Sequence, residues 1–235
     1  MLFGTDEASM RERTAAIVMA VLAASGILCA VLVGSGGVPT LAMSKPPVAA
    51  QVKGKVAERP DDTALGDRNA PIQVVEYASL ACSHCATMDK EVLPKLKAKY
   101  IDTGKLRYIY RDFPLNPFGT AAAMAAHCRG DEHFFDTISI IFDLQAWWLG
   151  GAADGEDAMN RLATVMRETG MSKAEFDRCI RDKTLLARVE DVASQAEKEF
   201  SVESTPTFII NGKTHVGELS FDRFEAILVP LLPKP

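Results

Sequence analysis

This chain has fewer positively charged than negatively charged residues. Its 235 residues include 26 lysines and arginines against 31 aspartates and glutamates, so the formal net charge is -5. The pI is near 5.5. Proteins that bind nucleic acid or an anionic membrane surface generally show the opposite balance. The composition therefore gives no reason to expect either partner, and an apolar content of 48% allows a buried core.

Cysteine is also sparse, which limits the metal sites that the chain can form. Only one Cys-x-x-Cys motif occurs, at Cys82 and Cys85, and a structural zinc site needs two further ligands. Cys128 and Cys179 do not form a second such motif, and His127 beside Cys128 points to a different face of a helix. We therefore expect no metal and no cofactor.

No charged residue occurs from Ala15 to Val33, a stretch close to the ~20 residues that span a bilayer. Arg11 and Arg13 precede it, so residues 1–14 are expected to stay in the cytoplasm and the rest to be exported. Residues 15–33 are either a transmembrane anchor or the apolar core of a signal, and Cys29 is a small apolar residue within them. The domain is then periplasmic or otherwise extracytoplasmic, either anchored to the inner membrane or cleaved and soluble.

Residues 34–61 are rich in Gly, Pro and Ala and have no sustained apolar period, so we expect a linker there. From 62 to 235 the pattern is that of a folded α/β domain. Strands are predicted at Ile72–Ala78, Lys105–Asp112, Thr207–Ile210 and Lys213–Val216, the last two joined by the hairpin pair Asn211-Gly212. Helices are predicted after Cys85, through most of the stretch 118–183, at Leu185–Phe200 and at Ser220–Leu232.

The two cysteines of the motif lie where a strand pattern gives way to a helix pattern. Cys82 is expected at the first turn of the helix, where free backbone N–H groups and the helix dipole favour a thiolate. We assign nucleophilic attack to Cys82 and resolution of the mixed disulfide to Cys85. His84 is expected to donate a hydrogen bond or positive charge to the Cys82 thiolate.

Apart from Cys29, the cysteines are even in number, and three pairings of four cysteines are possible. Cys82 with Cys85 is the local, redox-active pair, which leaves Cys128 with Cys179 as a structural disulfide across two helices of the insertion. The alternative for the second pair is two buried free thiols.

The residues quoted so far, with Glu76 and the segment Val202–Phe208, resemble the DsbA-like branch of the thioredoxin superfamily. The resemblance covers roughly residues 62–235. It implies a thioredoxin fold with an inserted α-helical subdomain at about 118–183. It also implies a cis bond between Thr205 and Pro206 beside Cys82, and a buried acid at Glu76 that exchanges a proton with Cys85.

The resemblance further implies the partners: reduced or unfolded exported polypeptides, and a quinone-linked membrane oxidase of the DsbB type. Pro206 would present the backbone of Thr205 to an extended substrate chain. The Trp147-Trp148 pair either lines an apolar substrate groove or belongs to the core of the helical subdomain.

The leading interpretation is thus an oxidase that introduces disulfides into exported proteins. Ser83 and Thr205 lie next to the sulfurs and are expected to tune the redox potential, so an isomerase or reductase of the same fold is an open alternative. An interpretation from another class is a non-catalytic thiol module that binds metal or holds unfolded chains.

Overall fold

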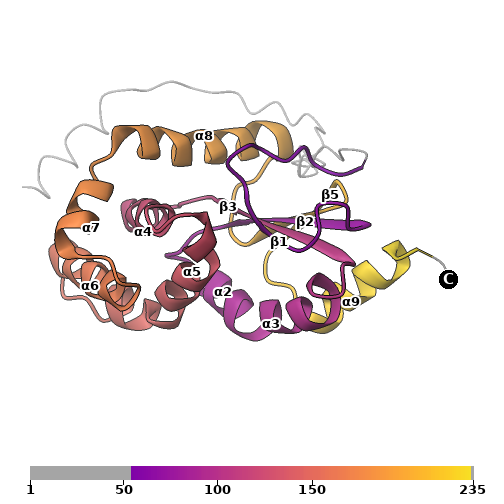
Figure 1. Cartoon of the computed structure of the whole chain (residues 1–235), viewed down its shortest axis with the longest axis horizontal. Helices are drawn as coiled ribbons and strands as arrows, with labels where there is room; N and C mark the ends of the chain where they lie inside the picture. The colour runs from indigo at the N-terminus through magenta and orange to yellow at the C-terminus, as the bar shows by residue number, and fades with distance from the viewer. Residues whose placement is uncertain (1–53, 234–235) are drawn as a thin grey trace, which may run out of the picture. The chain divides into compact units, whose positions relative to one another are not determined.

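The computed structural model describes residues 54–233 of the chain (Figure 1). The expected cytoplasmic segment 1–14, the expected span 15–33 and most of the expected linker therefore lie outside the described residues. Within residues 54–233, no helix is both long enough and apolar enough to cross a membrane.

The domain is a five-stranded mixed sheet covered by helices, with a helical insertion in the middle of its sequence. The strands are β1 Thr63–Leu65, β2 Ile72–Ala78, β3 Leu106–Asp112, β4 Thr207–Ile210 and β5 Lys213–Val216. The helices of the core are α2 Ser83–Thr87, α3 Leu93–Leu96, α8 Lys183–Phe200 and α9 Phe221–Leu228, and a short 3-10 turn at Val229–Leu231 follows α9. The insertion holds α4 Pro117–His127, α5 Phe134–Asp143, α6 Gly155–Glu168 and α7 Lys173–Cys179.

The strand order is β1-β3-β2-β4-β5, with β2 and β3 parallel and the other pairs antiparallel. A parallel neighbour requires a crossover, and the helical stretch from α2 onward supplies it. The hairpin predicted at Asn211-Gly212 is confirmed: both residues have positive φ, as a tight two-residue turn requires. These pairings make a thioredoxin fold.

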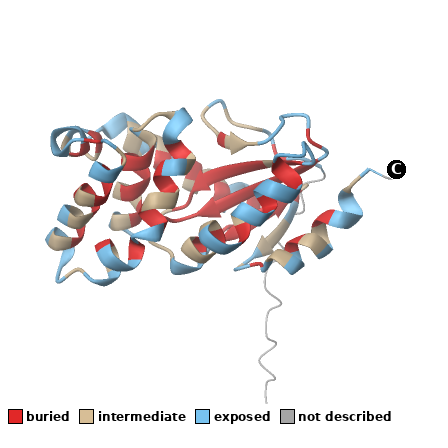
Figure 2. Ribbon diagram, turned by 60° about the horizontal axis from the view of Figure 1, so that its bottom comes forward, coloured by how far each residue is buried: buried red, intermediate tan, exposed pale blue. Residues whose placement is uncertain are grey.

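Helices cover both faces of the sheet, and every residue of β2 is buried as a result (Figures 1 and 2). Ile72 and Val74 pack with Leu96 and Phe224, on the face covered by the α2–α3 stretch and α9. Residues of the opposite parity pack against α8; these are Val75 and Tyr77, which meet Ala196 and Phe200. A strand buried on both faces explains why its sequence is almost continuously apolar.

The helical stretch that begins at α2 runs on to Ile101 with two π-helical segments, Met88–Val92 and Lys97–Ile101. The first comes directly before α3, which has Pro94 in its first turn. Proline has no N–H and its ring clashes with the carbonyl four residues back. The Leu93 N–H accordingly donates to the carbonyl of Met88, five residues back, and the helix continues past the proline.

The insertion is helical, as predicted, but the stretch 131–149 is not one helix. It is divided into a 3-10 turn at Asp131–His133, α5, and a π-helical turn at Ala146–Gly150. Leu144 and Gln145 lie at the break between α5 and the π-helical turn, and this places the Gln145 side chain against the core domain.

The domain begins earlier than residue 62. Val56 is buried, and its backbone N–H and carbonyl bond the Gln73 side chain at 2.7 and 3.0 Å. Arg111 donates to the Ala57 carbonyl, and Arg107 pairs with Glu58. The last residues of the expected linker 34–61 are therefore part of the folded domain. One valine among polar residues has no apolar period, so the sequence pattern did not mark it.

The structure joins Cys128 and Cys179 in a disulfide, with their Cα atoms 6.2 Å apart. Cys128 directly follows α4 and Cys179 ends α7, so the bond ties the first helix of the insertion to its last. The two residues are 51 positions apart in sequence, and a cross-link over so long a loop restricts the unfolded chain strongly.

We expect the double variant C128A/C179A to lose about 4 kcal/mol of unfolding free energy, from the loop length alone. Urea denaturation of both proteins, with Cys82 and Cys85 in the same redox state, measures the difference. Equal unfolding free energies would contradict a stabilising role for this disulfide.

Candidate active site

Cys82 lies at the boundary between β2 and α2, as the N-cap residue of the helix. A turn brings the chain to this point: the Cys82 N–H donates to the Ser79 carbonyl at 2.9 Å, and the Ala86 N–H donates to the Cys82 carbonyl at 3.1 Å. The first N–H groups of a helix have no partner within it, so those of His84 and Cys85 are free to bond the Cys82 sulfur.

The pKa of Cys82 is lowered to about 5, so this thiol is a thiolate at neutral pH. The largest cause is a hydrogen bond from the Cys85 thiol, and burial of the sulfur works against it. Smaller contributions come from the Thr205 side chain and the backbone N–H groups of Cys85 and His84. The prediction that the helix start favours an anion at this position agrees with these contacts.

Cys85 lies one turn further into α2 and is 1% exposed. Burial raises its pKa, and the neighbouring Cys82 and Glu76 raise it further. The two sulfurs therefore differ sharply: one is an accessible thiolate and the other a buried thiol that donates to it. This difference suits attack by Cys82 and resolution by Cys85, provided that a base removes the Cys85 proton.

Glu76 is the candidate for that base. It occupies the middle of β2, is 4% exposed, and accepts a hydrogen bond from the Tyr108 hydroxyl. Burial raises its pKa to about 8, and the Tyr108 bond only partly opposes this. A carboxyl group that titrates near neutral pH beneath Cys85 can both take up and return a proton.

The structure gives His84 a different partner from the one expected. Its Nδ1 lies 2.8 Å from the Glu218 carboxylate, and the side chain is 68% exposed. The bond to Glu218 raises the pKa of His84, with a smaller effect from Cys82. The direct bond to the Cys82 sulfur comes from the His84 backbone N–H, while the ring contributes charge only at a distance.

Thr205 and Pro206 lie beside the sulfurs, with a cis peptide bond between them. The Cys82 thiol donates to the Thr205 carbonyl at 3.4 Å. The Thr205 hydroxyl is buried and has no other hydrogen-bond partner among residues 54–233, and it supports the thiolate form of Cys82. The loop thus contacts Cys82 in both its protonation states.

The adjacent residues Trp147 and Trp148 differ in their burial. Trp148 is fully buried and its indole N–H donates to the Ile141 carbonyl at 3.0 Å. Trp147 is 45% exposed, beneath the Arg161 guanidinium. Trp148 therefore belongs to the core of the insertion, and only Trp147 is available to line a surface.

In the part of the chain that the structure describes, no three His, Cys, Asp or Glu residues gather as a metal site would require.

Gln145 is a site residue that the sequence reasoning missed. It comes from the insertion, is 8% exposed, and donates to the carbonyls of Leu80 at 2.8 Å and Cys82 at 3.1 Å. Leu80 is itself buried, so its carbonyl would lack a partner without this amide. Gln145 holds the loop that carries Cys82. The only sequence signal was one amide within an otherwise apolar run.

Comparison with known proteins points to one family. The sequence model described as thioredoxin matches residues 58–229. A protein-disulfide oxidoreductase of Rickettsia conorii is 30% identical over 185 residues, which are 78% of this chain and 65% of that protein. The chain thus spans just under two thirds of that relative's length.

Solved structures of similar proteins support the same family. Wolbachia pipientis alpha-DsbA1 superimposes with a TM-score of 0.66 at 33% identity, over 74% of this chain and 92% of that one. Bacillus subtilis BdbD has a TM-score of 0.65 at 18% identity, over 78% and 97% of the two chains, and supports the fold alone.

We expect Gln145→Leu to raise the pKa of Cys82 and to make the Cys82–Cys85 disulfide less oxidising. Losing the amide donors frees the loop that aims N–H groups at the sulfur. Hydrogen bonds worth ~0.5–1.5 kcal/mol correspond to a shift of roughly two- to tenfold in the equilibrium constant with glutathione. Thiolate absorbance against pH gives the pKa, and thiol–disulfide equilibration gives the constant.

The matched control is Gln73→Leu, because Gln73 is a buried amide that bonds Val56 on the opposite face of β2. Both variants should unfold at a lower temperature, and only Gln145→Leu should alter the two Cys82 measurements. If Gln145→Leu loses stability while the pKa and equilibrium constant stay at wild-type values, Gln145 has a structural role only.

Glu76 should make stability depend on pH. Between about 4.5 and 8 the folded carboxyl keeps its proton while the unfolded one has lost it. Its contribution to the unfolding free energy is therefore fully present below about 4.5 and is lost as pH rises through about 8. The difference in unfolding free energy between wild type and Glu76→Gln, both reduced, should fall over this range. A difference that does not vary with pH would contradict the raised pKa.

Proposed function

Because the chain belongs to the DsbA-like branch of the thioredoxin family, we propose that it is a thiol–disulfide oxidoreductase that introduces disulfides into exported polypeptides. The observation that carries the direction is the thiolate at Cys82, whose pKa is about 5, next to a buried thiol at Cys85. Stabilising the thiolate stabilises the reduced protein. A disulfide whose reduced form is stabilised is a stronger oxidant.

The reaction proceeds in two exchanges. A substrate thiolate attacks Cys82 of the oxidised protein, forming a mixed disulfide and releasing the Cys85 thiolate, which takes a proton from Glu76. A second substrate thiolate then attacks the substrate sulfur of the mixed disulfide, and Cys82 leaves as a stable thiolate. The substrate loses two electrons and two protons, and the pair Cys82–Cys85 gains the two electrons.

Several features support the direction of an oxidase and a location outside the cytoplasm. The leaving group of the second exchange is Cys82, and a thiol of low pKa leaves faster. The additional disulfide between Cys128 and Cys179 suits an oxidising compartment. Reoxidation then falls to a membrane oxidase, for which we propose a quinone-linked protein of the DsbB type. We further propose that residues 15–33 direct the export of the domain, as a membrane anchor or as part of a signal.

The alternative within the same chemistry is an isomerase or reductase that a membrane donor keeps reduced. A non-catalytic thiol module remains the alternative from another class. Metal analysis of protein purified under reducing conditions separates that one: stoichiometric copper or zinc without turnover favours the binding module.

We expect the Cys82–Cys85 pair to have a reduction potential well above the value of about -270 mV typical of thioredoxin. Equilibration with glutathione buffers at pH 7, followed by alkylation and mass measurement, gives the potential. A value close to that of thioredoxin would reject the oxidase and favour the reductase. Cys82→Ser serves as the control that shows no redox transition at this site.

A further inference from the structure

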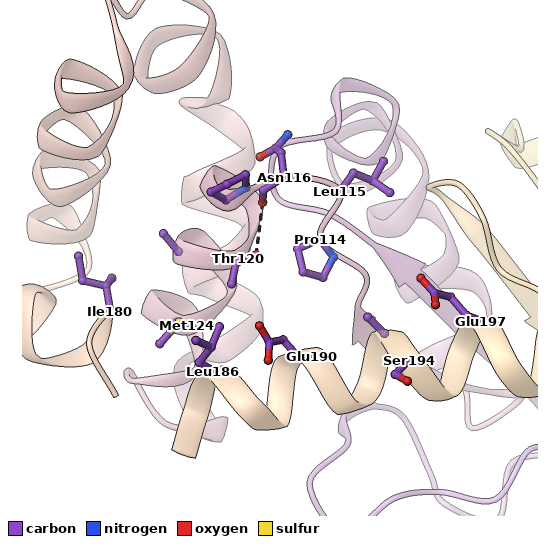
Figure 3. A pocket seen from close by; sticks show the side chains of 13 residues that line it. Pro114, Leu115, Asn116, Thr120, Met124, Ile180, Leu186, Glu190, Ser194 and Glu197 are labelled. Atoms are coloured by element: carbon purple, nitrogen blue, oxygen red, sulfur yellow. Dashed lines mark hydrogen bonds between the residues drawn. The ribbon is translucent and has the colours of Figure 1, made fainter. Parts of the chain in front are cut away.

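A groove of about 620 Å³ lies between α4 and α8, outside the active site (Figure 3). Its lining includes the apolar residues Pro114, Leu115, Met124 and Leu186. Leu115 is among the most exposed large apolar residues of the described part of the chain, at 54%. The volume lies within the range of about 300–1,000 Å³ typical of ligand sites.

Two carboxylates from α8 stand at this groove, on Glu190 and Glu197 (Figure 3). Both side chains point from the helix toward the segment that holds Pro114, and both residues are exposed. Neither forms an ion pair with any residue between 54 and 233, although Asp191 on the same helix pairs with Arg59. The groove therefore offers negative charge that has no cation within this domain.

The spacing of the two carboxylates indicates the conformation and the charge spacing of a segment that could bind there. Seven residues of α-helix rise about 10.5 Å. In a polyproline II chain, which has three residues per turn, residues three apart lie on the same side and are separated by about 9 Å. A polyproline II segment with cationic side chains at positions i and i+3 can therefore reach Glu190 and Glu197 at once, with apolar side chains between them along the groove.

The groove also continues toward the catalytic loop. A second hollow of about 490 Å³ shares Pro114, Leu115 and Glu197 with the first and extends to Val202 and Glu203. Glu203 is two residues from Thr205, whose carbonyl contacts Cys82. A chain that lies in the groove thus leads to the loop beside the catalytic sulfur.

The first turn of α4 separates the groove from the loop that carries Cys82. Residues Asn116, Pro117 and Thr120 line the groove. Gly119, on another side of the same turn, faces the loop: a methyl group there would lie 2.7 Å from the Ser79 hydroxyl. One helix is about 10–12 Å wide, a distance that three or four residues of extended chain can cover.

We propose that this groove binds a segment of substrate polypeptide in the extended polyproline II conformation, with two cationic residues three positions apart around apolar ones. The segment lies a few residues from the cysteine that reacts with Cys82. This inference rests on the proposed function, because an oxidoreductase for unfolded chains meets such extended segments. It adds a preference among substrates that the Cys-x-x-Cys centre itself does not supply.

The direct test uses a fluorescent peptide without cysteine, of the pattern Lys-Leu-Ala-Lys, and its counterpart with Glu in place of Lys. Fluorescence anisotropy with the full chain gives the dissociation constants. The Lys peptide should bind wild type more tightly than the Glu peptide. E190Q/E197Q should weaken the Lys peptide roughly three- to tenfold, as the loss of two exposed ion pairs implies, and the effect should shrink in high salt.

The matched control is E168Q/E199Q, which removes two exposed carboxylates that lie outside the groove and lack ion pairs in the described domain. This variant should bind the Lys peptide as wild type does. Equal losses in both double variants would show only a general charge effect and would overturn the proposal. Equal binding of the Lys and Glu peptides to wild type would overturn it as well.

Turnover by wild type on a neutral two-cysteine peptide, measured on the same preparation, separates the two proposals. Turnover together with equal binding of the Lys and Glu peptides rejects the groove and retains the oxidoreductase. Charge-selective binding that is lost in E190Q/E197Q, without any turnover, rejects the oxidoreductase and retains the groove as a peptide site.

Discussion

The stability of an anion at one sulfur depends on a short loop that is held from three directions. The loop Ser79–Cys82 closes on itself through the Ser79 carbonyl, enters α2 through the Cys82 carbonyl, and is fastened to the insertion by Gln145. Only with the loop in this position do the first N–H groups of α2 point at the Cys82 sulfur. A thiolate in water would have equally good hydrogen bonds, but they would not be preorganised.

Burial opposes the charged form of every titratable group around this sulfur, but the outcome differs between them. It opposes the charge on Cys82, where direct hydrogen bonds overcome it, and it dominates at Cys85 and Glu76, which have few bonds to offset it. Two identical side chains three residues apart thereby acquire different roles. The acid beneath them is placed by the pleat of β2, since residue 76 has the same parity as Ile72 and Val74 and faces the helix that carries both cysteines.

The helical insertion has more than one connection to this chemistry. Its disulfide ties α4 to α7, its Gln145 bonds the catalytic loop, and its α4 forms one wall of the groove whose other wall is α8. The insertion therefore extends the surface around a small redox core and at the same time constrains the position of Cys82.

Much of the fold was determined by the sequence itself, because it depends on residues close together in the chain. The hairpin at Asn211-Gly212, the capping box at Ser172 and Glu175, the buried strand Ile72–Ala78 and the cysteines at a helix start are all local, and the structure has each of them. Only the tertiary structure decided the partner of His84, which is Glu218, the bond from Gln145 to Leu80, and the burial of Val56 against Gln73. These contacts join residues that are distant in sequence, and no local spacing or period records which distant groups will meet once the sheet and the insertion have packed.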